Sequence, residues 1–257
     1  MKVDKVADKE IQTTVGGLRA VEMQYRSIRE ISGGHTAFYQ SQTRLNSPKL
    51  GVLTPDKFRD VCEMTNQSSK LFELELIQAL DACNTFIERE IAFNWLSLHM
   101  PVRCLREQRT IRMINERCSQ KEIPTSKVCF ELAVNLLEET DGEASDTINK
   151  MRNLGYHFML ADFGESSCPM MRLSDFSVDY VMLSPEVSNY IGKSERSDNA
   201  VRSIISFVNE LGSEPIADGV FNSKQAELLY SFECSYCAGS LAGKYMTERY
   251  VRGRKEE

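Results

Sequence analysis

The sequence has no long apolar run. No stretch approaches the roughly 18 consecutive apolar residues needed to cross a bilayer. Residues 1–8 carry charged side chains where a secretory signal would have an apolar core. With 42% hydrophobic and 26% charged residues, the chain can still bury a core and stay in solution. We therefore expect a cytoplasmic globular protein.

The chain also lacks a basic excess. Its formal net charge is −6 at pH 7, whereas domains that bind nucleic acid usually carry clustered positive charge. The one basic-rich stretch begins at Arg249 and is followed by Glu256 and Glu257, so we interpret residues 249–257 as a charged, solvated tail. We expect no direct contact with nucleic acid or membrane.

Residues that commonly hold metals are scattered along the chain. His35, His99 and His157 have no ligand partner at helical spacing, so we expect packing or surface roles for them. Cys234 and Cys237 have the spacing of a redox or zinc pair but lack a second pair of ligands. We expect two half-buried thiols there, and no metal site from these residues.

No glycine-rich dinucleotide fingerprint, internal repeat or low-complexity tract is present, and strands alternate with helices. Repeated units of this kind favour a parallel sheet covered by helices, and their number favours a closed (β/α)8 TIM-like barrel. We predict one α/β domain over residues 17–248 after a flexible extension over 1–16. The predicted strands are 21–28, 36–39, 91–98, 128–134, 156–161, 178–183, 215–217 and 236–241. One predicted helix begins near residue 54. The other predicted helices span 70–86, 102–118, 145–154, 201–211 and 223–232.

The helix that begins near residue 54 has clear signals in the sequence. Thr54 supplies a hydroxyl that can cap the first turn, and Pro55 suits the first helical position. Phe58, Val61 and Cys62 follow at helical spacing. We expect these three side chains to share one face of the helix.

Three acidic residues lie late in predicted strands or directly after them. They are Glu131, Asp162 and Asp218. In α/β barrels, functional side chains gather at the carboxyl ends of the strands. We therefore expect the three acids to converge on one mouth of the barrel.

Four segments, in order and spacing, resemble the EAL family of cyclic-di-GMP phosphodiesterases. Residues 21–28 resemble the opening strand, where Tyr-Gln-Pro-Ile is usual, and residues 34–38 fall where the Glu-Ala-Leu signature is expected. Residues 51–58 resemble Gly-x-Leu-Ser-Pro-x-x-Phe, and 160–164 resemble the stretch with two aspartates before Phe-Gly. The resemblance runs from about residue 20 to 245. It implies an EAL-type barrel whose relatives use two divalent cations to activate water and polarise a phosphate.

The resemblance implies that most residues for this chemistry have been replaced. The signature glutamate, a metal ligand, falls at Thr36, and the following arginine, which contacts the nucleotide, falls at Gln40. The first of the two aspartates falls at Ala161, and a lysine that supports the phosphate falls at Met182. The other replaced positions are Ser97 for a ligand asparagine, Val134 for a second glutamate, Ser184 for an aspartate and Ala238 for a glutamine.

Three acids remain at positions that the family uses. Glu131 and Asp162 are kept, and Asp218 replaces the glutamate expected to act as general base. Three acids are too few for two divalent cations, which need several anionic oxygens. We expect no phosphodiesterase activity, no metal and no cofactor, and we interpret these acids as retained for folding or hydrogen bonding. A single weakly held metal and binding of cyclic-di-GMP without hydrolysis stay open.

Residues 71–75 and 91–98 resemble the matching stretches of the YdiV-type anti-FlhDC factors, a degenerate EAL group of enterobacteria. That group binds FlhD, a subunit of the flagellar activator FlhDC, and keeps the activator from its promoters. The chain departs from it at Ser97, where the group keeps an asparagine. The resemblance implies a regulator that binds FlhD and represses motility. The alternatives are residual recognition or hydrolysis of cyclic-di-GMP, and a scaffold for another regulatory protein.

Overall fold

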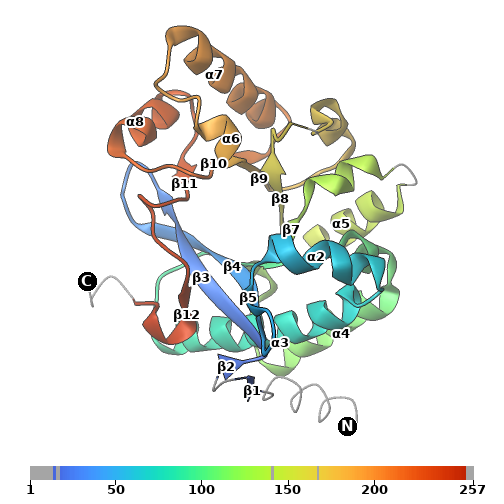
Figure 1. The fold of residues 1–257 in the computed structure, drawn as a ribbon. Helices are drawn as coiled ribbons and strands as arrows, with labels where there is room; N and C mark the ends of the chain where they lie inside the picture. Colours follow the sequence, from blue (N-terminus) through green and yellow to red (C-terminus); the bar gives the residue numbers. More distant parts are fainter. Residues whose placement is uncertain (1–13, 16–17, 140–141, 167, 253–257) are drawn as a thin grey trace.

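Eight strands close into a barrel in the computed structural model, which describes residues 14–15, 18–139, 142–166 and 168–252. Closure results because the first barrel strand pairs with both the second and the last (Figure 1). The predicted TIM-like barrel is therefore confirmed. In order around the barrel, the strands are β3 (Val21–Glu30), β4 (Thr36–Ser47), β6 (Leu96–His99), β7 (Val128–Leu132), β8 (His157–Phe163), β9 (Tyr180–Leu183), β10 (Glu214–Ala217) and β11 (Tyr236–Cys237).

One barrel strand runs against the others. β3 is antiparallel to β4 and β11, whereas every other neighbouring pair in the barrel is parallel. A tight turn joins β3 to β4, with Gly34 at φ +63°. Such a turn reverses the chain, while a helical crossover restores its direction. The alternation of strands and helices indicated a parallel sheet, and this strand is the exception.

The long β3–β4 ribbon carries two further strands. β5 (Gly51–Leu53) pairs with the end of β4, and β12 (Met246–Thr247) pairs with β3. Near the start of the chain, β1 (Thr14–Val15) pairs with β2 (Leu18–Arg19). Residues 1–13 and 16 of the predicted extension lie outside the described residues.

Helices surround the barrel (Figure 1). Among the residues that the structure describes, no helix is long and apolar enough to span a membrane. The α-helices are α2 (Pro55–Met64), α3 (Ser68–Glu88), α4 (Gln108–Gln120), α5 (Glu143–Asn153), α6 (Pro185–Ser188), α7 (Glu195–Glu210) and α8 (Ser223–Ser231). The 3-10 turns are η1 (Val102–Arg106), η2 (Thr125–Lys127), η3 (Val134–Glu138), η4 (Met170–Asp175) and η5 (Glu248–Tyr250).

Several predicted boundaries differ from the structure. β6 begins only at Leu96, and Val134 lies in η3 rather than in a strand. Thr54 precedes α2, but its hydroxyl bonds to the side chain of Asp56 and makes no capping bond to the backbone. Val251 is only 2% exposed, so the packed domain extends into the range predicted as a tail; residues 253–257 lie outside the described residues.

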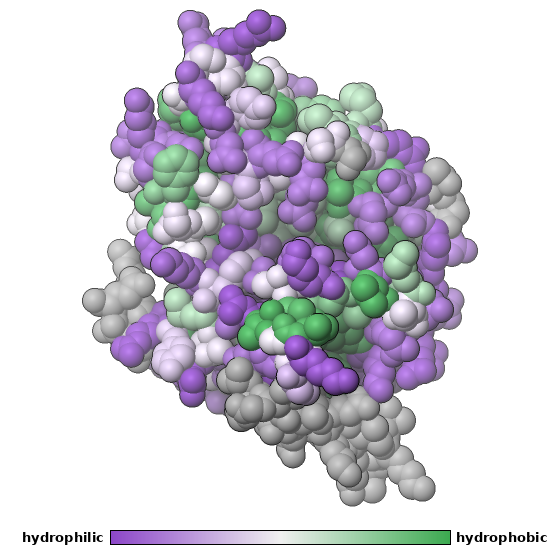
Figure 2. Space-filling model, viewed as in Figure 1, coloured by the Kyte–Doolittle hydropathy of each residue, from purple (hydrophilic) through white to green (hydrophobic). Residues whose placement is uncertain are grey.

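The predicted apolar face of α2 is only partly correct. Phe58 is buried, but Val61 is 57% exposed. Figure 2 shows a largely hydrophilic face with apolar side chains over β5 and along α2. The helix therefore presents apolar surface outward as well as inward.

The cysteine pair behaves as buried thiols. Cys234 and Cys237 are both free and buried. Burial raises the pKa of Cys234 to about 12 and that of Cys237 to about 11. A thiolate is therefore disfavoured at both, and a redox or metal-ligand role would require one.

Large apolar side chains fill the barrel interior. Phe38 and Trp95 stack with ring centroids 4.0 Å apart and planes 11° apart. Met182 and Ala238 belong to the same buried cluster. These side chains close the barrel below the mouth, so the space for a ligand is limited to the strand ends.

Replacing Trp95 with alanine should lower the free energy of unfolding by about 3–5 kcal/mol, because the change leaves a cavity in a packed interior. Urea denaturation followed by far-ultraviolet circular dichroism measures this, since Trp95 is the one tryptophan of the chain. Tyr230→Ala is the control; Tyr230 is 53% exposed, and its loss should change stability by no more than about 0.5 kcal/mol. Equal losses for both variants would contradict the described interior.

Candidate functional site

Three acidic side chains meet at one end of the barrel. Glu131 lies near the end of β7, Asp162 lies late in β8, and Asp218 follows β10. All three line a cavity of about 290 Å³. The convergence expected from the sequence is confirmed, because the carboxyl ends of parallel strands meet at one mouth.

A guanidinium group from β3 lies among these acids. Arg26 Nη2 donates to Asp218 Oδ2 at 2.7 Å, and Arg26 Nε and Nη2 donate to Gln40 Oε1 at 2.8 and 2.6 Å. The side chains of Arg26 and Asp218 are 12% and 14% exposed. The ring of Tyr245 covers the guanidinium at 4.8 Å. The positive charge in the mouth is therefore supplied by a side chain of the protein itself, that of Arg26.

Gln40 connects this cation to the next acid. Its Oε1 accepts from Arg26 and from the Tyr245 hydroxyl at 3.1 Å, while its Nε2 donates to Glu131 Oε2 at 2.8 Å. Ser97 Oγ donates to the same carboxylate oxygen at 3.2 Å. Because an amide both accepts and donates, Gln40 joins a positive group on one side to a carboxylate on the other.

The structure corrects the sequence-based position of the signature glutamate. Thr36 begins β4, and Tyr39 is the β4 residue level with Leu96 at the start of β6. Thr36 is thus four residues, or about 13 Å along a strand, from the level of Gln40. Gln40 contacts Glu131, so Gln40 and not Thr36 lies where β4 would supply a metal ligand. An amide there replaces a carboxylate of nearly the same shape.

The same shift applies to the arginine expected after the signature. Four residues beyond Gln40 is Arg44, which lies on the same face of β4 because side chains alternate along a strand. The position is therefore kept as an arginine.

The other replaced positions are part of the packed barrel or its rim. Ala161 lines the mouth and has no polar group. Ser97 is buried and bonded to Glu131. Those that pack into the interior or the surrounding core are Met182, Ser184 and Ala238, while Val134 packs against the core from η3.

Burial raises the pKa of Glu131 and of Asp162. Burial raises the pKa of Glu131, the hydrogen bond from Gln40 partly offsets this, and the charge of Asp162 raises it further. For Asp162, burial and the charge of Asp218 raise the pKa, and Arg26 lowers it only in part. Asp162 also has φ +57° at an irregularity of β8, a conformation that is strained for a residue with a side chain.

This set of donors does not fit two divalent cations. Such a pair needs several anionic oxygens in near-octahedral arrangements. Here Gln40 is neutral, one oxygen of Glu131 accepts two hydrogen bonds, and Asp218 is paired with Arg26. Among the described residues, no group of three or more histidine, cysteine or acidic side chains is placed to hold a metal.

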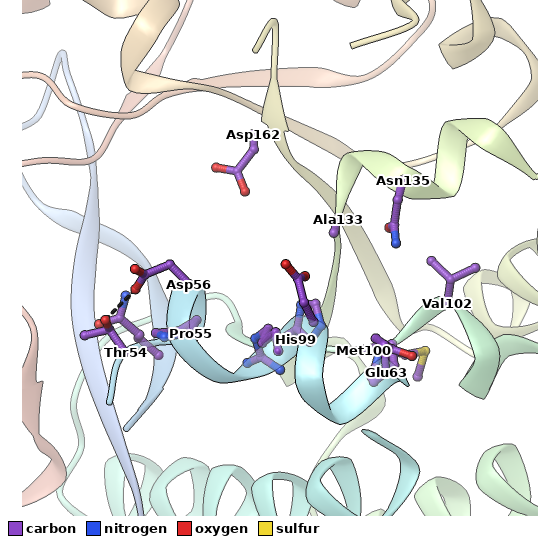
Figure 3. A pocket seen from close by; sticks show the side chains of 14 residues that line it. Thr54, Pro55, Asp56, Glu63, His99, Met100, Val102, Ala133, Asn135 and Asp162 are labelled. Carbon is purple, nitrogen blue, oxygen red and sulfur yellow. Dashed lines mark hydrogen bonds between the residues drawn. The ribbon is translucent and has the colours of Figure 1, made fainter. Parts of the chain in front are cut away.

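A second cavity, of about 430 Å³, adjoins the mouth between α2 and the end of β8 (Figure 3). Asp162 points into it from β8, and His99 lines it from β6. Arg59 of α2 turns inward and binds Glu75 Oε1 of α3 at 3.2 Å. Burial lowers the pKa of His99, and Arg59 lowers it further, so the imidazole is neutral near pH 7. The Arg59–Glu75 contact holds α2 across one side of the mouth.

The sequence interpretation missed Arg26, Tyr245 and Arg59. Arg26 had a visible signal, since it falls where the family strand has glutamine and a charge in a barrel strand is unusual. Tyr245 had none, because it reaches Gln40 across 205 positions of sequence. Arg59 lies on a helix whose orientation toward Glu75 only the fold reveals.

Replacing Arg26 with methionine should lower the free energy of unfolding by about 3 kcal/mol near pH 7, because Asp218 is left buried without its cation. Adding Asp218→Asn should recover part of this loss, since neither charge then remains. The matched control is Lys121→Met, which breaks the more exposed pair with Asp81 and should cost less than about 1 kcal/mol. Urea denaturation of wild type, Arg26→Met, Asp218→Asn, the double variant and Lys121→Met decides, and additive losses for Arg26 and Asp218 would argue against their coupling.

The raised pKa of Glu131 predicts a pH-dependent effect of Glu131→Gln. Its folded-state pKa exceeds the usual 4.5, so protonation stabilises the wild-type fold at low pH, and this stability is lost as pH rises through the folded-state pKa. The variant has no such loss. Its free energy of unfolding relative to wild type should therefore increase from pH 4.5 to about pH 7.5. Urea denaturation of both proteins at pH 4.5 and at about pH 7.5 measures this change. A difference in unfolding free energy that stays the same at both pH values would refute the prediction.

Comparisons with known proteins agree with this architecture. The sequence matches the EAL domain family over residues 9–245. It is 25% identical over 233 residues to the cyclic di-GMP phosphodiesterase RocR of Pseudomonas aeruginosa, covering 89% of this chain and 58% of RocR. It is 22% identical over 231 residues to an uncharacterized protein of Azorhizobium caulinodans, covering 88% of this chain and 31% of that protein. The chain thus spans about a third to three fifths of these relatives.

Solved structures share the fold. The PaMucR phosphodiesterase in complex with c-di-GMP superposes with a TM-score of 0.81 at 15% identity, covering 98% of this chain and 100% of that one. The Xanthomonas citri FimX EAL domain in complex with c-diGMP superposes with a TM-score of 0.77 at 14% identity, covering 98% of each. The barrel, its one antiparallel strand and the match across nearly the whole sequence lead to one conclusion: the chain belongs to the EAL domain family.

Proposed function

We propose that this chain is a catalytically inactive EAL-domain regulator. In this proposal it binds a transcription regulator, the FlhD subunit of FlhDC, and thereby represses flagellar gene expression and motility. Its mouth would take no part in phosphodiester hydrolysis. It would act in the cytoplasm as a protein-binding barrel without a cofactor.

The observation that carries the proposal is the guanidinium in the mouth. Arg26 donates to Asp218 and Gln40, and these are positions that would otherwise face a metal ion. A fixed cation repels a divalent ion and already satisfies the acid beside it. The neutral amide of Gln40 removes one further anionic ligand. Water activation by two metals lacks its ligands in such a site.

The choice of FlhD rests on the resemblance to the YdiV-type factors. Several residues that carry this resemblance, including Phe72, Trp95 and Leu98, are buried. They therefore reflect similar packing inside the barrel and do not mark the surface that would contact a partner. The net charge of −6 is compatible with binding a DNA-binding protein, which carries basic surface.

A receptor for cyclic-di-GMP is the second candidate. Two observations favour it: Arg44 stands where the family has the arginine that contacts the nucleotide, and the two cavities share Arg59, His99 and Asp162 in their walls. Binding without hydrolysis needs phosphate and base contacts but no metal pair. The two candidates differ in whether the nucleotide binds at all.

Titration calorimetry separates the candidates. We expect no heat from cyclic-di-GMP, with or without Mg²⁺ or Mn²⁺, and a stable complex with FlhD that needs neither nucleotide nor metal. Nucleotide binding in the micromolar range or tighter, about −8 kcal/mol, would instead establish the receptor. No binding of FlhD would remove the regulator proposal in its present form.

A paired substitution tests the role of Arg26. The double variant Arg26→Gln and Gln40→Glu removes the cation and restores a carboxylate beside Glu131, so Mn²⁺ should raise its melting temperature while leaving wild type unchanged. Arg26→Gln alone is the control, because it frees Asp218 without adding an acid. A wild-type protein that Mn²⁺ stabilises as strongly as the double variant would contradict the proposed block.

A further inference from the structure

A further cavity lies between the barrel wall and helix α3. It has a volume of about 400 Å³, and its lining comes from β2, β3, α3, β12 and η5. Figure 1 shows β12 and η5 beside the first part of β3. None of the described residues that line this cavity also lines the mouth. Its volume falls within the range of about 300–1,000 Å³ that small-molecule sites occupy.

Three buried side chains line this cavity. Met23 and Tyr25 are 4% and 2% exposed, and Gln78 is 5% exposed. The amide Nε2 of Gln78 donates to the carbonyl oxygen of Val21 at 3.2 Å. In the part of the chain that the structure describes, no group donates to Gln78 Oε1. A buried amide oxygen without a donor is costly, so this oxygen favours a ligand that brings an N–H group.

Four charged side chains of both signs complete the lining. Arg19 and Arg249 are exposed, and Glu22 and Glu248 are half-buried. Among the residues that the structure describes, none of these four groups has an ion-pair partner. The guanidinium of Arg249 lies over the ring of Tyr250, 4.7 Å from its centroid. Two positive and two negative groups therefore surround one cavity and leave their charges available to a ligand.

This arrangement selects against a ligand with charge of one sign. An anion would be repelled by Glu22 and Glu248, and a cation would be repelled by Arg19 and Arg249. A zwitterion satisfies both pairs, because its carboxylate can accept from a guanidinium while its ammonium group donates to a carboxylate. The charges of the lining therefore fit a small molecule with one group of each sign.

We propose that this cavity binds a free α-amino acid with an apolar side chain. The ammonium group would donate to Gln78 Oε1 as well as to the acids, and the apolar side chain would pack against Met23 and Tyr25. Both of these residues pack favourably against an aromatic ring. The inference goes beyond the proposed function, since it requires neither FlhD nor cyclic-di-GMP.

Titration calorimetry of the full chain with L-phenylalanine tests this site, with two blocked analogues for comparison. N-acetyl-L-phenylalanine carries only the negative charge, and L-phenylalanine methyl ester carries only the positive charge. We expect L-phenylalanine to bind with a dissociation constant of about 1 mM or tighter. Each analogue should bind at least about tenfold more weakly, because each loses the charge-assisted hydrogen bonds of one end.

A double variant tests whether the acids of the lining are responsible. Glu22→Gln with Glu248→Gln removes both negative charges with little change of shape. L-phenylalanine should then bind at least about tenfold more weakly, while N-acetyl-L-phenylalanine should bind more tightly than it does to wild type. The matched control is Glu195→Gln with Glu227→Gln, which removes two exposed acids of α7 and α8 and should leave both affinities unchanged. Circular dichroism checks that both double variants are folded.

Three results would overturn the inference. The first is the absence of heat from L-phenylalanine with the wild-type protein. The second is equal affinity for L-phenylalanine and either blocked analogue, which would mean that the cavity does not recognise both charges. The third is equal weakening in the two double variants, which would reflect net charge alone. The separate titration with FlhD decides the proposed function, so the two can fail independently.

Discussion

The hydrogen-bonded contact of Arg26 with Asp218 and Gln40 is the constraint on which the mouth depends. A metal ion in such a position is held by equilibrium and leaves when its concentration falls. The guanidinium of Arg26 is always present because it belongs to a barrel strand. Its planar N–H groups donate in fixed directions to two acceptors, Gln40 and Asp218. Asp218 therefore has a permanent partner. The pairing with Arg26 balances the charge of Asp218 within the fold.

Gln40 completes this balance because of its chemistry as an amide. A carboxylate there could accept from Arg26 but would face Glu131 as a second negative group. The amide accepts on one side and donates on the other. Tyr245 and Ser97 bond to the same chain of groups. A hydrogen-bonded network of this kind can contribute more to stability than its separate bonds would.

The barrel and the convergence of its three acids could be predicted from the sequence, because both depend on regular features. Strand-helix alternation determines the architecture, and parallel strands bring their ends to one mouth. The prediction failed at the register of β4: moving a strand by four residues keeps the same side chains facing inward, so the pattern could not distinguish Thr36 from Gln40. Contacts across the closure of the barrel, such as that between Arg26 and Asp218 over 192 positions, leave no local trace at all.

The reversed strand β3 has a consequence for how the protein forms. It brings Arg26, from the beginning of the chain, beside Tyr245, from near its end, so the mouth cannot be assembled until almost the whole chain has been synthesised. Contacts of such long sequence separation form late and slowly. Until Arg26 and Asp218 meet, each lacks its partner in the mouth. The network is therefore complete only when residues from both ends of the chain have met, and a chain that ends before Tyr245 leaves the guanidinium of Arg26 without the ring that covers it.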